Sequence, residues 1–121
     1  MKLLIIDDHS IVREGVAALL GRPGSGIEVV QACDATEGLA VIDDHADLDA
    51  VLLDLYLPGR DGISALRDIA ERRPDLPVVL TTGYAGPALQ GAYDDGIDVL
   101  AKPYELKALE AALSIARSRR K

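Results

Sequence analysis

Five short, mostly aliphatic runs constrain the fold of this chain more than any other feature of its sequence. They are Leu3–Ile6, Ile27–Ala32, Ala50–Leu53, Val78–Leu80 and Ile97–Leu100. A strand is apolar on both of its sides when helices cover both faces of the sheet, and sheets covered in this way are predominantly parallel. We therefore interpret the five runs as the strands of a buried parallel sheet.

Segments with the period of an α-helix lie between these runs and after the last one. The first follows a Ser10 cap, the second begins with a capping box of Asp34 and Glu37, and the third follows an Asp61 cap. A weaker fourth helix is expected after Gly86-Pro87, and the last helix carries an apolar stripe. That stripe consists of Leu106, Leu109, Leu113 and Ala116. Strands and helices thus alternate, which predicts a three-layer α/β fold.

Length, charge and cysteine content narrow the class of protein. A chain of 121 residues suits one domain, and a net charge of −7 argues against binding to nucleic acid or to an anionic membrane. The basic residues 117–121 are interpreted as a helix end or the start of a linker. The single Cys33 is expected to be a small buried residue, and no apolar run or leader pattern points to a membrane or to secretion. We expect a cytoplasmic domain.

Polar residues follow four of the predicted strands. Asp7 and Asp8 end the first strand, Asp54 ends the third, Thr82 lies at the end of the fourth, and Lys102 follows the fifth. Ligands of such sheets bind beyond the carboxyl ends of the strands. Neighbouring carboxylates repel each other, so their grouping indicates a hard cation such as Mg²⁺, and a carboxylate beside that cation can accept a phosphoryl group.

These residues, in this order and spacing, resemble the receiver domain of two-component response regulators of the chemotaxis-regulator type. The resemblance covers Met1 to about Arg117, and it implies a flavodoxin-like (βα)5 sandwich with a five-stranded parallel sheet in the order 2-1-3-4-5. Four motifs carry it: Ile6-Asp7-Asp8, the run Leu52–Gly62, the run Leu76–Gly83, and Ala101-Lys102-Pro103-Tyr104.

The resemblance implies a role for each acidic residue. Asp54 would accept a phosphoryl group from the phosphohistidine of a histidine kinase or a phosphotransfer domain. Asp8 and Asp54 would bind Mg²⁺ directly, together with the backbone carbonyl of Tyr56, while Asp7 would act mainly through a metal-bound water. Apart from its own phosphorylation and slow dephosphorylation, such a domain is not expected to be an enzyme.

Two further residues are implied to contact the phosphoryl group. Thr82 resembles the switch hydroxyl, and Lys102 resembles the lysine that pairs with the phosphoryl oxygens. One position departs from the family pattern, because Val99 stands where an aromatic switch residue is expected. The signal is therefore expected to reach a partner through the face of the fourth helix. That partner is an output domain or effector protein, and a homodimer is possible.

Other interpretations remain open from the sequence. The chain could be a binding-only pseudo-receiver, although it keeps the acidic pair, the acceptor and the lysine. An aspartate-nucleophile phosphohydrolase would need a second aspartate two residues after the nucleophile, and Tyr56 occupies that position. His9 and His45 are expected to be structural or solvent-facing.

Overall fold

The computed structural model describes residues 1–54, 56–57, 60–82, 98–101, 107, 110–111 and 113–115. At residues 56, 57, 60, 61, 82 and 98–101, the description covers the backbone alone. The predicted fourth helix and Lys102 lie outside the described residues.

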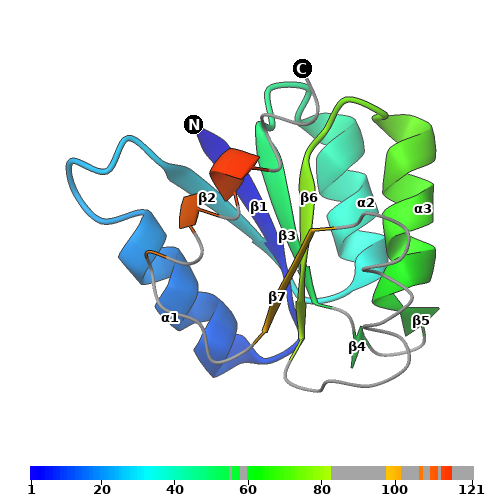
Figure 1. Ribbon diagram of the computed structural model, residues 1–121, viewed down its shortest axis with the longest axis horizontal. Helices are drawn as coiled ribbons and strands as arrows, with labels where there is room; N and C mark the ends of the chain where they lie inside the picture. The colour runs from blue at the N-terminus through cyan, green and yellow to red at the C-terminus, as the bar shows by residue number, and fades with distance from the viewer. Residues whose placement is uncertain are drawn as a thin grey trace.

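A five-stranded parallel sheet forms the centre of the molecule (Figure 1). Its strands, in spatial order, are β2 (Glu28–Ala32), β1 (Lys2–Ile6), β3 (Ala50–Asp54), β6 (Val78–Thr82) and β7 (Asp98–Ala101). Every neighbouring pair is parallel. The predicted sheet, including its 2-1-3-4-5 order, is thereby confirmed.

Helices lie on both faces of the sheet. Figure 1 shows α1 (Ser10–Leu20) on one face, and α2 (Ala35–Asp44) and α3 (Gly62–Arg72) side by side on the other. Residues 107, 110–111 and 113–115 are helical and fall within the predicted last helix. A short antiparallel pair, β4 (Tyr56–Leu57) and β5 (Arg60–Asp61), lies between β3 and α3 along the chain.

The helix starts agree with the prediction in one case and differ in another. Asp34 caps α2 and accepts a hydrogen bond from the Glu37 backbone N at 2.8 Å, while Glu37 Oε1 accepts one from the Cys33 backbone N at 3.1 Å. The Ser10 cap is wrong: Ser10 is the first residue of α1, and the cap position belongs to His9, whose side chain makes no capping hydrogen bond. The His9 ring is therefore available for other contacts.

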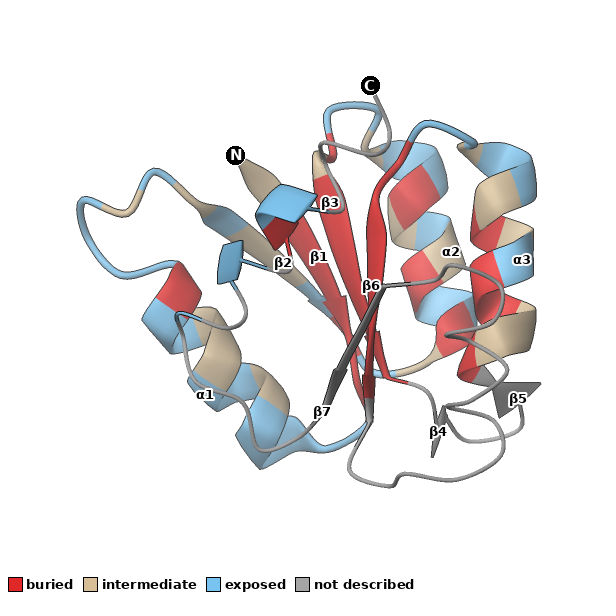
Figure 2. Cartoon of the chain, in the orientation of Figure 1, coloured by how far each residue is buried: buried red, intermediate tan, exposed pale blue. Residues whose placement is uncertain are grey.

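Figure 2 shows that β1 and β3 are buried along most of their length. The side chains of β1 alternate between two apolar clusters, one on each face of the sheet. Leu4 and Ile6 pack in the cluster beneath α2 and α3. Leu3 and Ile5 pack on the other face with Leu113, which is buried as the stripe of the last helix predicts. Because both faces are covered, the strand has no polar side, which explains its continuous aliphatic sequence.

Gly38 brings α2 close to the sheet. A Cβ atom at this position would lie 2.4 Å from Ile6 Cδ1 and 2.8 Å from Ile6 Cγ1, and the Ile6 side chain is itself buried. A larger residue here would force the core to repack. The glycine thus sets the separation between α2 and the strand that ends next to Asp7.

The expectation of a buried Cys33 is wrong, because this residue is exposed at the end of β2. Local packing around the sulfur, followed by the carboxylates of Glu37 and Asp34, raises the pKa of the Cys33 thiol above its ordinary value. The thiolate is disfavoured here, so the residue lacks the electropositive surroundings of a reactive cysteine.

None of the helices within the described residues has the length and the apolar character that a membrane span requires.

Candidate metal centre

The register of β1 and β3 brings two buried carboxylates together at the carboxyl edge of the sheet. Ile6 pairs with Leu53, so Asp7 and Asp54 come next along adjacent strands. Both side chains are almost fully buried, each with a relative exposure of 3% for the residue. Asp8, one residue further along, is more exposed. The predicted grouping of these three acidic residues is therefore present in the fold.

A histidine joins these carboxylates. Asp7, Asp8, His9 and Asp54 each offer a ligand atom, and all four atoms lie within 4.8 Å of one another. We call these four residues the carboxyl-edge cluster. His9 Nδ1 lies 3.0 Å from Asp7 Oδ1, 3.3 Å from Asp8 Oδ1 and 3.5 Å from Asp54 Oδ2. His9 was expected to be structural or solvent-facing rather than part of the site, although its position directly after the acidic pair was an available signal.

The backbone around Asp7 is held by several hydrogen bonds. The Asp7 backbone N donates to Ala32 O at 3.1 Å, which extends the β1 to β2 pairing by one residue. The His9 backbone N donates to Asp7 Oδ1 at 2.9 Å. Arg13 Nη1 donates to the Asp7 carbonyl at 2.7 Å, and its Nε donates to Gln31 Oε1 at 3.1 Å. Arg13, which was not among the predicted site residues, thus connects the loop before α1 to β2.

The remaining predicted site residues are described in part. Thr81 is buried and pairs in register with Asp54. Thr82 is the last residue of β6 and pairs in register with Ala101, the residue before Lys102. The backbones of Tyr56 and Val99 lie in β4 and β7. The described part of the chain does not include the side-chain contacts of four predicted site residues: Thr82, Lys102, Tyr56 and Val99.

The three carboxylates of the carboxyl-edge cluster fit Mg²⁺. Three carboxylates supply the hard oxygen ligands that Mg²⁺ takes in proteins, usually one or two of them together with waters or phosphate oxygens. Two unit charges about 4 Å apart repel by about 4 kcal/mol at an effective dielectric near 20. A bound dication would remove this repulsion, which is why the arrangement favours cation binding.

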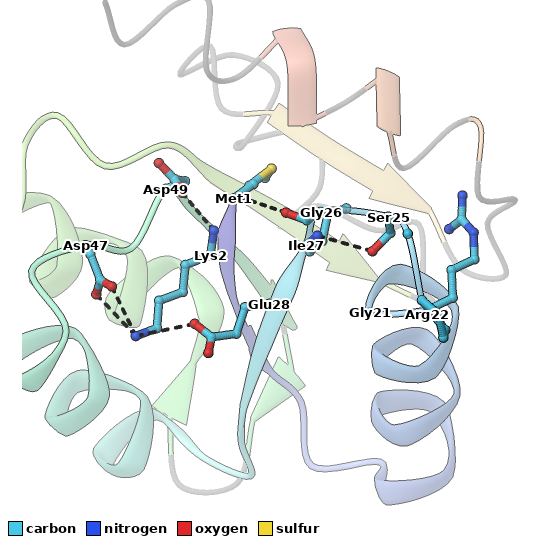
Figure 3. A pocket seen from close by; sticks show the side chains of 12 residues that line it. Met1, Lys2, Gly21, Arg22, Ser25, Gly26, Ile27, Glu28, Asp47 and Asp49 are labelled. Atoms are coloured by element: carbon cyan, nitrogen blue, oxygen red, sulfur yellow. Dashed lines mark hydrogen bonds and ion pairs between the residues drawn. The ribbon is translucent and has the colours of Figure 1, made fainter.

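The opposite edge of the sheet holds a second group of charged residues, around a pocket of about 570 Å³ (Figure 3). Lys2 Nζ lies 3.2 Å from Asp47 Oδ1 and 3.7 Å from Glu28 Oε2. The Lys2 backbone N donates to Asp49 Oδ2 at 2.7 Å. We call Lys2, Glu28, Asp47 and Asp49 the amino-edge cluster. Lys2 thus contacts all three carboxylates of this cluster through its ammonium group or its backbone N, which distinguishes it from the carboxyl-edge cluster.

Comparisons with known proteins agree with this geometry. The sequence matches the response regulator receiver domain over residues 3–114. It is 36% identical to the uncharacterized transcriptional regulatory protein YhcZ of Bacillus subtilis, over 91% of this chain and 50% of that protein. It is 34% identical to the transcriptional regulatory protein DltR of Streptococcus agalactiae, over 98% of this chain and 50% of that protein. The chain thus spans about half the length of these curated relatives.

Solved structures agree as well. A response regulator receiver domain protein from Clostridium thermocellum superposes with a TM-score of 0.85 at 31% identity, covering 98% of this chain and 95% of that one. A receiver domain protein from Methanospirillum hungatei, described as CheY-like, superposes with a TM-score of 0.85 at 26% identity, over 98% of this chain and 94% of that one. By sequence match, topology and the acidic residues at the carboxyl edge, this chain belongs to the response regulator receiver domain family of two-component systems.

Proposed function

We propose that this chain is a Mg²⁺-dependent phospho-acceptor whose acceptor residue is Asp54. The observation that carries the proposal is the placement of the Asp54 carboxylate at the end of a central strand, within 4.8 Å of ligand atoms of Asp7 and Asp8. A buried carboxylate at a fixed position can act as a nucleophile if the neighbouring negative charge is neutralised. The family to which the chain belongs supports the same role.

The proposed reaction transfers a phosphoryl group from a phosphohistidine of a histidine kinase or phosphotransfer domain. An Asp54 carboxylate oxygen attacks phosphorus, the new P–O bond forms as the P–N bond breaks, and the imidazole nitrogen keeps the electron pair. Asp8, Asp54 and the Tyr56 carbonyl would hold Mg²⁺, with Asp7 acting through water. When bound, Mg²⁺ would offset the charge of the carboxylates and of the phosphoryl oxygens.

Two residues complete the proposed site on its other side. Thr82 would donate its hydroxyl to the phosphoryl group, and Lys102 would pair with the phosphoryl oxygens. The pairing of Thr82 with Ala101 supports this, because it brings the chain just before Lys102 to the same edge of the sheet. Val99 cannot act as a rotating aromatic switch, so we propose that the face of the fourth helix transmits the signal.

We further propose that residues 1–121 form one receiver domain, with residues 117–121 as a helix end or the start of a linker. The curated relatives named as transcriptional regulators are about twice as long as this chain, which supports an output domain or an effector protein as the partner. The exposed free thiol of Cys33 suits a reducing compartment, so we place the domain in the cytoplasm.

Intact-mass measurement after incubation with acetyl phosphate tests the acceptor. Wild type is expected to gain one phosphoryl group with Mg²⁺ and none without a divalent cation. Asp54→Asn should gain none, since an amide is not a nucleophile here, whereas Asp47→Asn at the amino edge should behave like wild type. Equal uptake by wild type and Asp54→Asn would refute the assignment. No uptake by wild type, with a cognate kinase supplied as well, would favour the binding-only alternative.

A further inference from the structure

The His9 ring occupies a position that its role at the start of α1 does not require. His9 has extended backbone angles (φ −83°, ψ 94°) and lies at the helix cap without a side-chain capping hydrogen bond. Although the side chain is 62% exposed, its Nδ1 faces three carboxylates. His9 Nδ1 lies within hydrogen-bond distance of Asp7 Oδ1, which orients the ring over the acidic group and places the same nitrogen close to oxygens of Asp8 and Asp54.

The distances around His9 Nδ1 match those between ligands of one metal ion. Adjacent ligands are about 3.0 Å apart in an octahedron with bonds of about 2.1 Å, and about 3.3 Å apart in a tetrahedron with bonds near 2.0 Å. His9 Nδ1 lies 3.0, 3.3 and 3.5 Å from oxygens of Asp7, Asp8 and Asp54. One cation could therefore contact the nitrogen and the oxygens with small adjustments.

We propose that His9 Nδ1 is a metal ligand, and that it makes the carboxyl-edge cluster selective for first-row transition-metal dications over Mg²⁺. The inference rests on the proposed cation site and concerns which ion this chain's own residues select. Mg²⁺ takes oxygen ligands, whereas imidazole is a favourable ligand for Co²⁺, Ni²⁺ and Zn²⁺. A nitrogen donor beside three carboxylates raises the affinity for these ions more than the affinity for Mg²⁺.

The local structure prepares the ring for this role. The His9 backbone N donates to Asp7 Oδ1 at 2.9 Å, and the Arg13 backbone N donates to His9 O at 2.9 Å. His9 is therefore anchored on both sides by its main chain, independently of its ring. Replacing His9 by alanine removes the nitrogen while leaving the backbone hydrogen bond to Asp7 possible.

Calorimetric titration with Co²⁺ and with Mg²⁺ tests the proposal on wild type, His9→Ala and His45→Ala. The chain contains two histidines, so His45, at the far end of α2, provides a matched control. Any oxygen site also prefers Co²⁺ to Mg²⁺ to some degree, so the measured quantity is the change in the ratio of the two dissociation constants. The visible absorption of bound Co²⁺ gives a second readout, and thermal unfolding checks that each variant folds.

For His9→Ala, the Co²⁺ affinity is expected to fall at least about tenfold more than the Mg²⁺ affinity, by analogy with the cost of disturbing a metal ligand. The visible spectrum of Co²⁺ should change, and His45→Ala should match wild type. An unchanged affinity ratio and spectrum in His9→Ala would overturn the proposal while leaving the Mg²⁺ site intact. If wild type bound neither ion, both this proposal and the Mg²⁺ site would be refuted, which separates the two failures.

Discussion

Each of the two edges of the sheet holds three carboxylates, but the groups that these carboxylates contact differ between the edges. At the amino edge, Lys2 contacts the carboxylates of Asp47 and Glu28, and its backbone N donates to Asp49. At the carboxyl edge, three aspartates gather within 4.8 Å around a histidine. In the first cluster, each carboxylate has a partner on Lys2. The second brings anions together and, on electrostatic grounds, is stabilised by a bound cation. The comparison separates carboxylates that contact a lysine of the fold from carboxylates that we propose bind a cation.

The largest expected difference between the two edges is the response to Mg²⁺. A cation that binds the folded state alone stabilises it by about 2.7 kcal/mol at 100 times its dissociation constant. We therefore expect Mg²⁺ to raise the unfolding temperature of wild type. Asp8→Ala, at the carboxyl edge, should lose this gain, and Asp47→Asn, at the amino edge, should keep it. Equal gains in the two variants would contradict the assignment of the cation to the carboxyl edge.

A smaller effect, of opposite sign at the two edges, is expected without any metal. Asp49→Ala should lower the free energy of unfolding by about 1 to 2 kcal/mol, because the part-buried Lys2 backbone N loses its acceptor. Asp8→Ala should raise it by about 1 kcal/mol, because it removes a repelling charge from a partly solvated position. Urea unfolding in the presence of a chelator measures both. A loss of stability in Asp8→Ala would show that this edge is already neutralised.

The smallest expected effect concerns pH at the amino edge. The hydrogen bond from Lys2 holds the pKa of Asp47 below its ordinary value. The stabilisation from this pair is therefore present above the ordinary aspartate pKa, and it is lost as the pH falls through the lowered pKa of the folded state. Lys2→Met should move the Asp47 pKa upward, as followed by carboxyl NMR titration. An unmoved pKa would mean that Lys2 does not neutralise this residue in solution.

The sheet was predictable from the sequence because strands covered on both faces are aliphatic throughout. Their order along the chain, with helical segments between them, leads to one sandwich. The observed strand bounds differ from the predicted ones by one or two residues; β6, for example, spans Val78–Thr82, whereas the sequence predicted Val78–Leu80. The paired strands β4 and β5 were missed, because two-residue strands show no periodicity.

Local side-chain environments were harder to predict. Ser10 and His9 are adjacent, and propensity favours serine as a cap, yet the chain enters α1 with His9 at the cap position. Cys33 was expected to be buried as a small apolar residue, but it lies exposed in the bend between β2 and α2. In both cases the outcome depends on the path of the loop, which the pattern of apolar residues does not encode.

The sequence by itself determined the class of fold and the presence of carboxylates at the strand ends, because periodicity and residue order along the chain carry that information. The tertiary structure decided how these groups meet. The register of β1 against β3 places Asp7 beside Asp54, and the loop before α1 turns the His9 ring toward both. Register and loop direction arise from contacts between segments distant in the sequence. For that reason, the proximity of the histidine to the carboxylates emerged only from the folded chain.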